Sequence, residues 1–281
     1  MNVRFSDARQ VVVEHRRWVE ALARAGYATR GALYVIVGGL SALAAFGYGG
    51  ETTDTKGALL ELYRQPFGAL LLTLAAVGLA GYAAFLVCRA ALDPEGEARS
   101  QSGPLKRFWW ALMAVLHASL AVWAISMVLG SGSSADGDEQ TRGVTAMVLG
   151  WRPLGPWLVG AVGVGFGVGA AYDFYCAFSS KLDKALDLSR LSAGARRWAV
   201  RASRFGIAAR ACVSLAAGAF FIVAAVRSNP HEAKGFADSL GSLRAMPMGA
   251  YLFAAVSLGL IAFGVYQLIE ARYRRVLGRA R

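Results

Sequence analysis

Charged residues are scarce in this sequence, because Asp, Glu, Lys and Arg make up only 17% of its 281 residues, whereas hydrophobic residues make up 56%. A typical soluble domain is about a quarter charged and holds no apolar run near 20 residues long. The scarcity therefore excludes an ordinary soluble enzyme and predicts a polytopic membrane protein. Its six apolar runs cover residues 31–47, 67–92, 108–130, 154–178, 205–226 and 248–269.

Cysteine and histidine are also rare, with three residues of each type. Three cysteines, all within apolar runs, exclude a disulfide framework, and their spacing does not match a metal site. The sequence lacks the HExxH, CxxC, GxSxG and GxxxxGK[ST] motifs, so the best-known catalytic signatures are absent. We therefore predict that the protein is not an enzyme and has no catalytic residues, no metal and no cofactor.

The apolar runs predict helices and not barrel strands. Each run is continuously apolar, whereas strands of a membrane barrel alternate between apolar and polar residues. At a rise of about 1.5 Å per residue, runs of this length match a hydrocarbon core of about 30 Å. Before the first run, Val12, His15, Val19 and Leu22 recur at helical spacing. We interpret residues 1–30 as a cytoplasmic tail and an interfacial amphipathic helix that runs into the first span.

The distribution of basic residues predicts the orientation. Of the 30 Lys and Arg residues, 23 fall on one side: in the two tails, in the segments that join the second to the third run and the fourth to the fifth, or, for Arg89 and Arg210, near the ends of the runs that adjoin these segments. Because cytoplasmic loops are enriched in Lys and Arg, both termini are expected inside a bacterial cytoplasmic membrane. The net charge of +12 is then explained by topology and by attraction to anionic lipid headgroups on the cytoplasmic side. A nucleic-acid partner is not needed to explain it.

The sequence contains three copies of a two-span unit. The second, fourth and sixth runs open with P-x-G and continue with a glycine and an aromatic residue at constant spacing. These residues are Pro66, Gly68, Gly78 and Phe85 in the first copy, Pro153, Gly155, Gly165 and Tyr172 in the second, and Pro247, Gly249, Gly259 and Tyr266 in the third. The odd runs of the first and third copies begin with R-x-G-x-x-x-R, which spans Arg24–Arg30 and Arg204–Arg210, whereas Met113 replaces the second arginine in the second copy.

This pattern resembles the bacterial membrane family catalogued as domain of unknown function 1206, over roughly residues 18–275. The resemblance implies six spans and no established activity, and it identifies no catalytic or ligand-binding residue. We assign hairpin repeat 1 to residues 31–95, repeat 2 to 105–180 and repeat 3 to 205–275. A basic cytoplasmic linker is expected at 181–204.

Each copy has two spans, so all three enter the membrane in the same direction. We therefore predict an all-α membrane protein whose six transmembrane helices form three repeated hairpins around a pseudo-threefold axis along the membrane normal. Small residues near the bilayer centre would allow close helix packing. Two sets are interpreted as axial packing, with a pore or hydrophobic gate as the alternative: Gly78, Gly165 and Gly259 near the centre, and Phe85, Tyr172 and Tyr266 nearer the cytoplasm.

His117 is a polar residue in the middle of the third run, where polar groups are costly and require a reason. The alignment of the copies places it opposite Tyr34 and Ser214. One interpretation is a neutral, hydrogen-bonded packing residue, and the alternative is a proton or ligand group in a pore.

Asp173 lies near the cytoplasmic end of the fourth run. We predict a salt bridge from Asp173 to Arg30, Arg89 or Arg210 that holds helices together, with a proton-coupling carboxylate as the alternative. Apart from such a bridge, Arg30 and Arg210 are expected to snorkel to lipid headgroups.

Two functions remain open. The absence of motifs and the small loops favour a non-catalytic accessory or structural subunit, with a membrane-protein partner or a homo-oligomer. The alternative is a transporter or channel for a small solute or ion, with a central site between the repeats. A charged central cavity would favour transport, and a dry, glycine-packed axis would favour the accessory role.

Overall fold

A computed structural model describes residues 16–50, 52–93, 103–131, 137–179, 186–189 and 191–274. Six of its helices are long and apolar enough to cross a membrane, which confirms the predicted number of spans. They are α2 (Arg16–Ala45), α4 (Gly68–Leu92), α5 (Gly103–Val128), α7 (Leu154–Phe178), α9 (Ala193–Arg227) and α11 (Gly249–Tyr273).

Short helices join the two spans of each repeat, where the sequence had predicted only loops. They are α3 (Thr55–Arg64), α6 (Gly137–Leu149) and α10 (Phe236–Ser242), and the single turns η1 (Pro230–Glu232) and η2 (Leu243–Ala245) flank α10. In α3, the Asp54 side chain caps the helix by accepting a hydrogen bond from the Gly57 backbone N–H at 2.8 Å. Ala58 and Leu59 are buried on one face, so α3 is an amphipathic helix that packs on the spans.

The P-x-G motif forms the turn between each short helix and the following span. The middle residue is left-handed in repeats 1 and 3, with φ of 61° at Phe67 and 58° at Met248. In all three repeats, a Cβ on the motif glycine would collide with a backbone carbonyl of the preceding short helix or turn. The glycine is therefore required because the chain passes too close to itself for any side chain.

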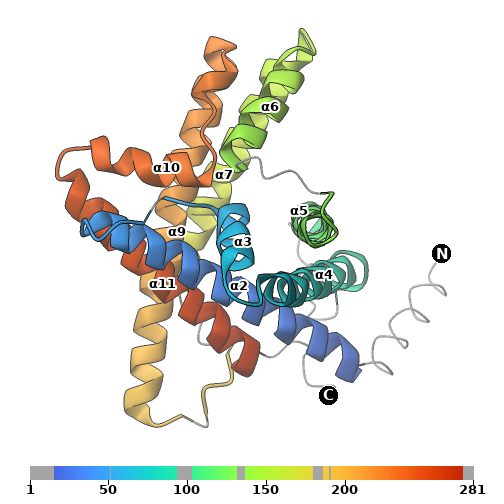
Figure 1. The fold of residues 1–281 in the computed structure, drawn as a ribbon, viewed down its shortest axis with the longest axis vertical. Helices are drawn as coiled ribbons and strands as arrows, with labels where there is room; N and C mark the ends of the chain where they lie inside the picture. The colour runs from blue at the N-terminus through green and yellow to red at the C-terminus, as the bar shows by residue number, and fades with distance from the viewer. Residues whose placement is uncertain are drawn as a thin grey trace.

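The spans pack in a definite order (Figure 1). Extensive contacts join α4 to α5, α7 to α9 and α11 to α2, which are contacts between repeats, and also α2 to α4 and α9 to α11 within repeats 1 and 3. Among the described residues, α5 and α7 of repeat 2 share no such interface. In Figure 1, α5 lies beside α4 on one side of the molecule, and α7 crosses behind α9. The largest buried cluster accordingly includes residues of every span except α7.

Small residues line the interfaces between repeats. A Cβ on Gly163 of α7 would lie 2.7 Å from the Gly218 carbonyl oxygen of α9. A Cβ on Gly38 of α2 would lie 2.8 Å from the Ser257 carbonyl oxygen of α11. These close approaches are typical of membrane helices, whose association depends on van der Waals packing. By the repeat alignment, the equivalent pair between α4 and α5 is Ala76 and Ala121, and both belong to the largest buried cluster.

The structure gives the helix boundaries near two of the predicted units. Helix α2 begins at Arg16 and continues into the first span, as the sequence predicts for this segment, and Val12 and His15 lie outside the described residues. Helix α9 begins at Ala193, with Ser192 as its N-cap. The second half of the predicted linker 181–204 is therefore the first part of a long helix, and residues 181–185 lie outside the described part of the chain.

Candidate functional site

Arg210 and Asp173 form a salt bridge between α9 and α7, which confirms the predicted pairing of Asp173 with an arginine. Their side chains are 26% and 20% exposed. The Arg210 guanidinium also lies 5.1 Å from the ring centroid of Phe263, on α11. Arg210 is thus held against α7 and α11 by a carboxylate and an aromatic face.

Arg30 is also held inside the bundle, but by neutral groups. Its guanidinium donates to the Tyr82 hydroxyl at 2.6 Å and lies 4.8 Å from the centroid of the same ring. The Gln267 amide oxygen accepts from Arg30 at 3.2 Å when the amide nitrogen donates to Glu270 at 2.6 Å. Arg30 therefore joins α2 to α4 and α11.

Glu270 is a buried carboxylate at the end of α11, and its side chain is 4% exposed. It forms an ion pair with Arg274, one turn further along the chain, whose side chain is 13% exposed. Since an isolated buried charge is costly, this pairing explains how the bundle accommodates Glu270. The Arg274 guanidinium lies 5.3 Å from the Tyr27 ring centroid, which links the pair to α2.

His117 lies on α5 and contacts Tyr82, the residue that binds Arg30. Its Nδ1 is 2.7 Å from the Met113 carbonyl oxygen, and because a carbonyl only accepts, Nδ1 carries the proton and donates. The ring is 4.9 Å from the Tyr82 ring in an edge-to-face arrangement, and the Tyr82 hydroxyl accepts from Arg30. His117 is therefore a hydrogen-bonded packing residue of the interface between α4 and α5 that also belongs to the polar cluster.

Tyr34 and Ser214, the predicted counterparts of His117, have different surroundings. The Tyr34 ring packs 4.7 Å from the Phe263 ring, which Arg210 also contacts. Ser214 is buried within α9, at 8% exposed. The structure thus brings five of the predicted polar residues into one neighbourhood, namely Arg30, Tyr34, His117, Asp173 and Arg210.

Three members of this cluster, Tyr82, Gln267 and Glu270, were not predicted from the sequence. Gln267 lies within the sixth apolar run and Glu270 directly follows it. A polar pair three residues apart at the end of a span is itself a signal, because such groups need partners inside the membrane. Tyr82 had no polar neighbour in sequence to indicate its role.

The predicted axial glycines do not share one environment. A Cβ on Gly78 would collide with Thr29 of α2, and one on Gly259 with Ala209 of α9, so both lie at close helix crossings as predicted. A Cβ on Gly165 would meet no atom within 4 Å, so its predicted packing role is wrong. The physical reason is that α5, the helix it would face within repeat 2, does not pack along α7.

The three predicted aromatic residues are likewise in different surroundings. Phe85 is 1% exposed and packs against Tyr27 and Tyr82. Tyr172 is 49% exposed and lies near Tyr175. Tyr266 is half-buried beside Phe263. Only Phe85 is a fully buried packing residue, so the three rings are not equivalent as a ring around an axis would require.

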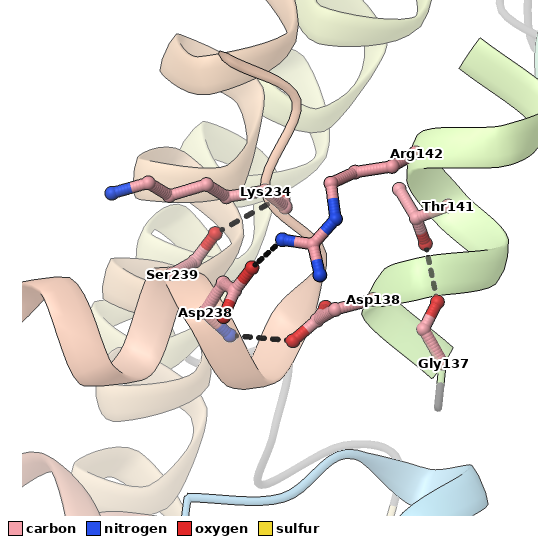
Figure 2. A network of polar contacts seen from close by, with 7 residues as sticks. All are labelled: Gly137, Asp138, Thr141, Arg142, Lys234, Asp238 and Ser239. Atoms are coloured by element: carbon pink, nitrogen blue, oxygen red, sulfur yellow. Dashed lines mark hydrogen bonds and ion pairs between the residues drawn. The ribbon is translucent and has the colours of Figure 1, made fainter. Parts of the chain in front are cut away.

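A polar network joins the short helices of repeats 2 and 3 (Figure 2). Arg142 of α6 forms a 2.8 Å ion pair with Asp238 of α10, and the Asp238 backbone N–H donates to Asp138 of α6, also at 2.8 Å. Asp138 thereby caps the N-terminus of a helix in another repeat. On the other side of α6, Lys56 of α3 donates to Gln140 at 3.1 Å. The short helices of all three repeats are therefore linked to one another.

A basic surface pocket lies where α9 begins. A surface pocket of about 560 Å³ is lined by Arg196, Arg197, Arg201 and Arg204, with Leu188, Leu191 and Val200 as its apolar residues. The preceding segment is fixed to the end of α11, since the Asp187 backbone N–H donates to the Tyr273 carbonyl at 2.8 Å. The pocket therefore combines guanidinium groups with an apolar wall.

Comparison with known proteins identifies the class of this molecule. The family model described as Domain of Unknown Function (DUF1206) matches three segments, residues 25–93, 109–180 and 205–274. The chain belongs to this family, and it is a multi-pass membrane protein built from three copies of the family unit. It is 32% identical over 263 residues to "Uncharacterized protein YxxB" of Bacillus subtilis (strain 168), which covers 94% of each chain. No solved structure matches it.

Proposed function

We propose that the protein is a non-enzymatic transporter or channel for a small anionic solute, with its site at the polar cluster between the repeats. One observation supports this choice over the accessory role, namely that every span contributes a polar side chain to the same neighbourhood. The contributing residues are Arg30 of α2, Tyr82 of α4, His117 of α5, Asp173 of α7, Arg210 of α9 and Gln267 of α11.

Such a cluster is costly to place in a membrane. Insertion scales give about 2.5–3.5 kcal/mol for an arginine at the centre of a spanning helix, which is an upper bound for Arg30 and Arg210 because both lie at or near the start of their apolar runs. A scaffold needs only a dry axis of small residues, and the interfaces between repeats already provide this packing at Gly163 and Gly38. Intramembrane ionisable groups are by default candidates for a solute or ion pathway. The cost of two arginines therefore favours solute binding.

We further propose that the spans are related by a pseudo-threefold axis along the membrane normal. Equivalent contacts support it within each repeat. A Cβ on Gly26 would collide with Tyr82, one on Gly206 with Phe263, and one on Gly169 would lie 3.6 Å from the Trp109 ring. These three pairs occupy equivalent positions, with glycine and aromatic exchanged between the helices in repeat 2. The same contact thus recurs where the odd and even spans meet.

The location and orientation belong to the same proposal. The protein would lie in the bacterial cytoplasmic membrane with both termini inside, as the distribution of Lys and Arg indicates. The arginine pocket at the start of α9 would then face the cytoplasmic headgroups. Guanidinium groups bind phosphate oxygens well, so anionic lipid headgroups are the proposed partners of this pocket.

Reconstitution into liposomes tests the proposed function. Purified protein is expected to increase the flux of small organic anions across the membrane, and His117→Ala should reduce this flux. His231→Ala is the matched control, because His231 is exposed on η1, outside the spans. Flux that both variants leave unchanged would refute the role of the cluster. An absence of anion flux from folded protein would refute transport and return support to the accessory role.

A further inference from the structure

The repeat alignment shows that the two intramembrane arginines occupy equivalent positions with different partners. Arg210 and Arg30 are the second arginines of the R-x-G-x-x-x-R motif in repeats 3 and 1. Each contacts the preceding even span at the same register, where α7 provides Asp173 and α11 provides Gln267. One interface thus holds an arginine with a carboxylate, and the other holds an arginine with a neutral amide.

The third interface, between α4 and α5, shows what the fold requires at this position. The equivalent residues there are Leu86 and Met113, and both pack in one apolar cluster. An apolar pair is therefore sufficient to join an even span to the next odd span. The charge of Arg30 is not needed for helix packing, so it requires another explanation.

The surroundings of Arg30 leave one positive charge in excess. Among the described residues, no carboxylate lies within ion-pair distance of its guanidinium; its polar contacts are the Tyr82 hydroxyl and the Gln267 amide. Glu270, the nearest acid in this chain of contacts, is paired with Arg274. The four groups Arg30, Gln267, Glu270 and Arg274 therefore sum to +1, whereas Arg210 and Asp173 sum to zero.

The neighbours of Arg30 also offer donors to an anion. The Tyr82 hydroxyl accepts from Arg30, so its own proton is available to a third group. The His117 Nδ1 is bound to Met113, and Nε2, the other ring nitrogen, makes no hydrogen bond to the described part of the chain. A guanidinium and a hydroxyl that converge from α2 and α4 form a site for an oxyanion, since charge-assisted bonds from arginine to carboxylate or phosphate oxygens are strong and directional.

We propose that Arg30 and Tyr82 bind an oxyanion group, a carboxylate or a phosphate, which supplies beside Arg30 the negative charge that Asp173 supplies beside Arg210. An oxyanion bound here would be the substrate class of the transporter proposed above, and that assignment rests on the proposed function. The existence of the binding site does not, because binding is measured without transport. Because Gln267 is neutral, it leaves the charge of Arg30 free to attract the bound oxyanion, which a glutamate at this position would neutralise.

The test uses the full-length protein in nanodiscs of phosphatidylcholine and measures thermal unfolding against the concentration of sodium phosphate or sodium succinate, with chloride holding the ionic strength constant. At least one oxyanion should stabilise the wild-type protein beyond the effect of chloride. Gln267→Glu should weaken this binding by about tenfold or more, because it provides the missing carboxylate and removes a charge-assisted contact. Without ligand, the new carboxylate gains the Arg30 charge but loses the hydrogen bond that Gln267 donates to Glu270, so the unfolding temperature of the ligand-free variant is measured separately to distinguish loss of binding from loss of fold.

Two further variants sharpen the test. Gln65→Glu is the matched control, because Gln65 is exposed and donates to Glu61 at 3.0 Å much as Gln267 donates to Glu270. It should leave oxyanion binding unchanged. Arg30→Gln should abolish the stabilisation. Wild-type protein that no oxyanion stabilises, or a Gln267→Glu variant that binds as wild type does, would overturn the proposal.

Lipid is a second source of the same chemistry, and nanodiscs that contain phosphatidylglycerol distinguish it. If the ligand is a free solute, it should stabilise the protein equally in both kinds of nanodisc. If the ligand is a lipid headgroup, phosphatidylglycerol without added solute should raise the unfolding temperature of the wild-type protein but not that of Arg30→Gln. Oxyanion binding without flux would refute the transporter and leave this site intact. Flux that Gln267→Glu does not affect would refute the site and leave the transporter intact.

Discussion

Repeat 2 differs from repeats 1 and 3 in how its own two spans meet. In repeat 1, Leu33 and Ala75 are buried at 2% and 7% exposed. Their equivalents in repeat 3 are also buried, whereas Leu116 and Val162 of repeat 2 are 46% and 48% exposed. The same register thus forms core in two repeats and an open surface in the third. The contact between Trp109 and Gly169 shows that α5 and α7 still meet at one level, and they diverge beyond it.

A difference in side-chain size explains the divergence. In repeats 1 and 3, the mid-membrane glycine of the even span faces Thr29 or Ala209 of the odd span. The equivalent residue in repeat 2 is Leu112, which is 39% exposed. A leucine is too large for the approach that threonine and alanine permit against glycine. Gly165 consequently has no neighbour across the gap, and α7 packs on α9 through Gly163 instead.

Two glycines on α7 should therefore respond very differently to the same substitution. Gly163→Leu should destabilise the protein by about 3 kcal/mol or prevent folding, because the side chain would enter the Gly218 backbone. Gly165→Leu should change stability by less than about 0.5 kcal/mol, as is usual for a site without packed neighbours. Unfolding temperature and yield of folded protein measure both. Equal losses would show that Gly165 is packed and that the contrast between the repeats is not real.

Removal of the Asp173 carboxylate should have the next largest effect. Asp173→Ala leaves the Arg210 charge without its partner and should cost about 2 kcal/mol, less than a fully buried pair because both side chains retain some exposure. The double variant with Arg210→Ala should recover part of the loss, as a double-mutant cycle in unfolding experiments would show. Gln267→Ala should cost less, because the amide is neutral. An Asp173→Ala variant as stable as wild type would contradict a structural role for the bridge.

The link between the short helices of repeats 2 and 3 should contribute less. Arg142→Ala removes an ion pair with Asp238 whose side chains are 39% and 38% exposed. Such exposed pairs contribute about 0–1 kcal/mol, and salt screens them. The loss in unfolding free energy should therefore shrink as salt is added. A loss that is large and independent of salt would indicate that this link closes the end of the bundle more tightly than its exposure suggests.

The number of spans and the repeat could be predicted from the sequence because continuous apolar runs and the P-x-G turn are local signals. The Asp173 bridge followed from the cost of a charge in a membrane, which leaves few partners. The partner of Arg30 could not be predicted, because Gln267 becomes meaningful only when α11 packs on α2. Gly165 was mispredicted because the repeat register implied the same hairpin in each copy. The difference in repeat 2 becomes visible only when Leu112 is compared with Thr29 and Ala209, the smaller residues at the equivalent position of the other repeats.

The smallest expected change in stability gives the sharpest test of the comparison. Leu112→Ala should alter unfolding by less than about 1 kcal/mol, because Leu112 is half-exposed in the structure. It should, however, allow α5 to approach Gly165 as α2 approaches Gly78.

Cysteines that replace Leu116 and Val162, in a chain whose three native cysteines are changed to alanine, report on this approach through disulfide formation. They should cross-link slowly with Leu112 present and faster with Leu112→Ala. Cysteines at Leu33 and Ala75 should cross-link rapidly in either background, since these residues are buried in one core cluster. Rapid cross-linking of the repeat 2 pair with Leu112 in place would show that α5 and α7 already meet, and the side-chain size of Leu112 would then not explain any separation.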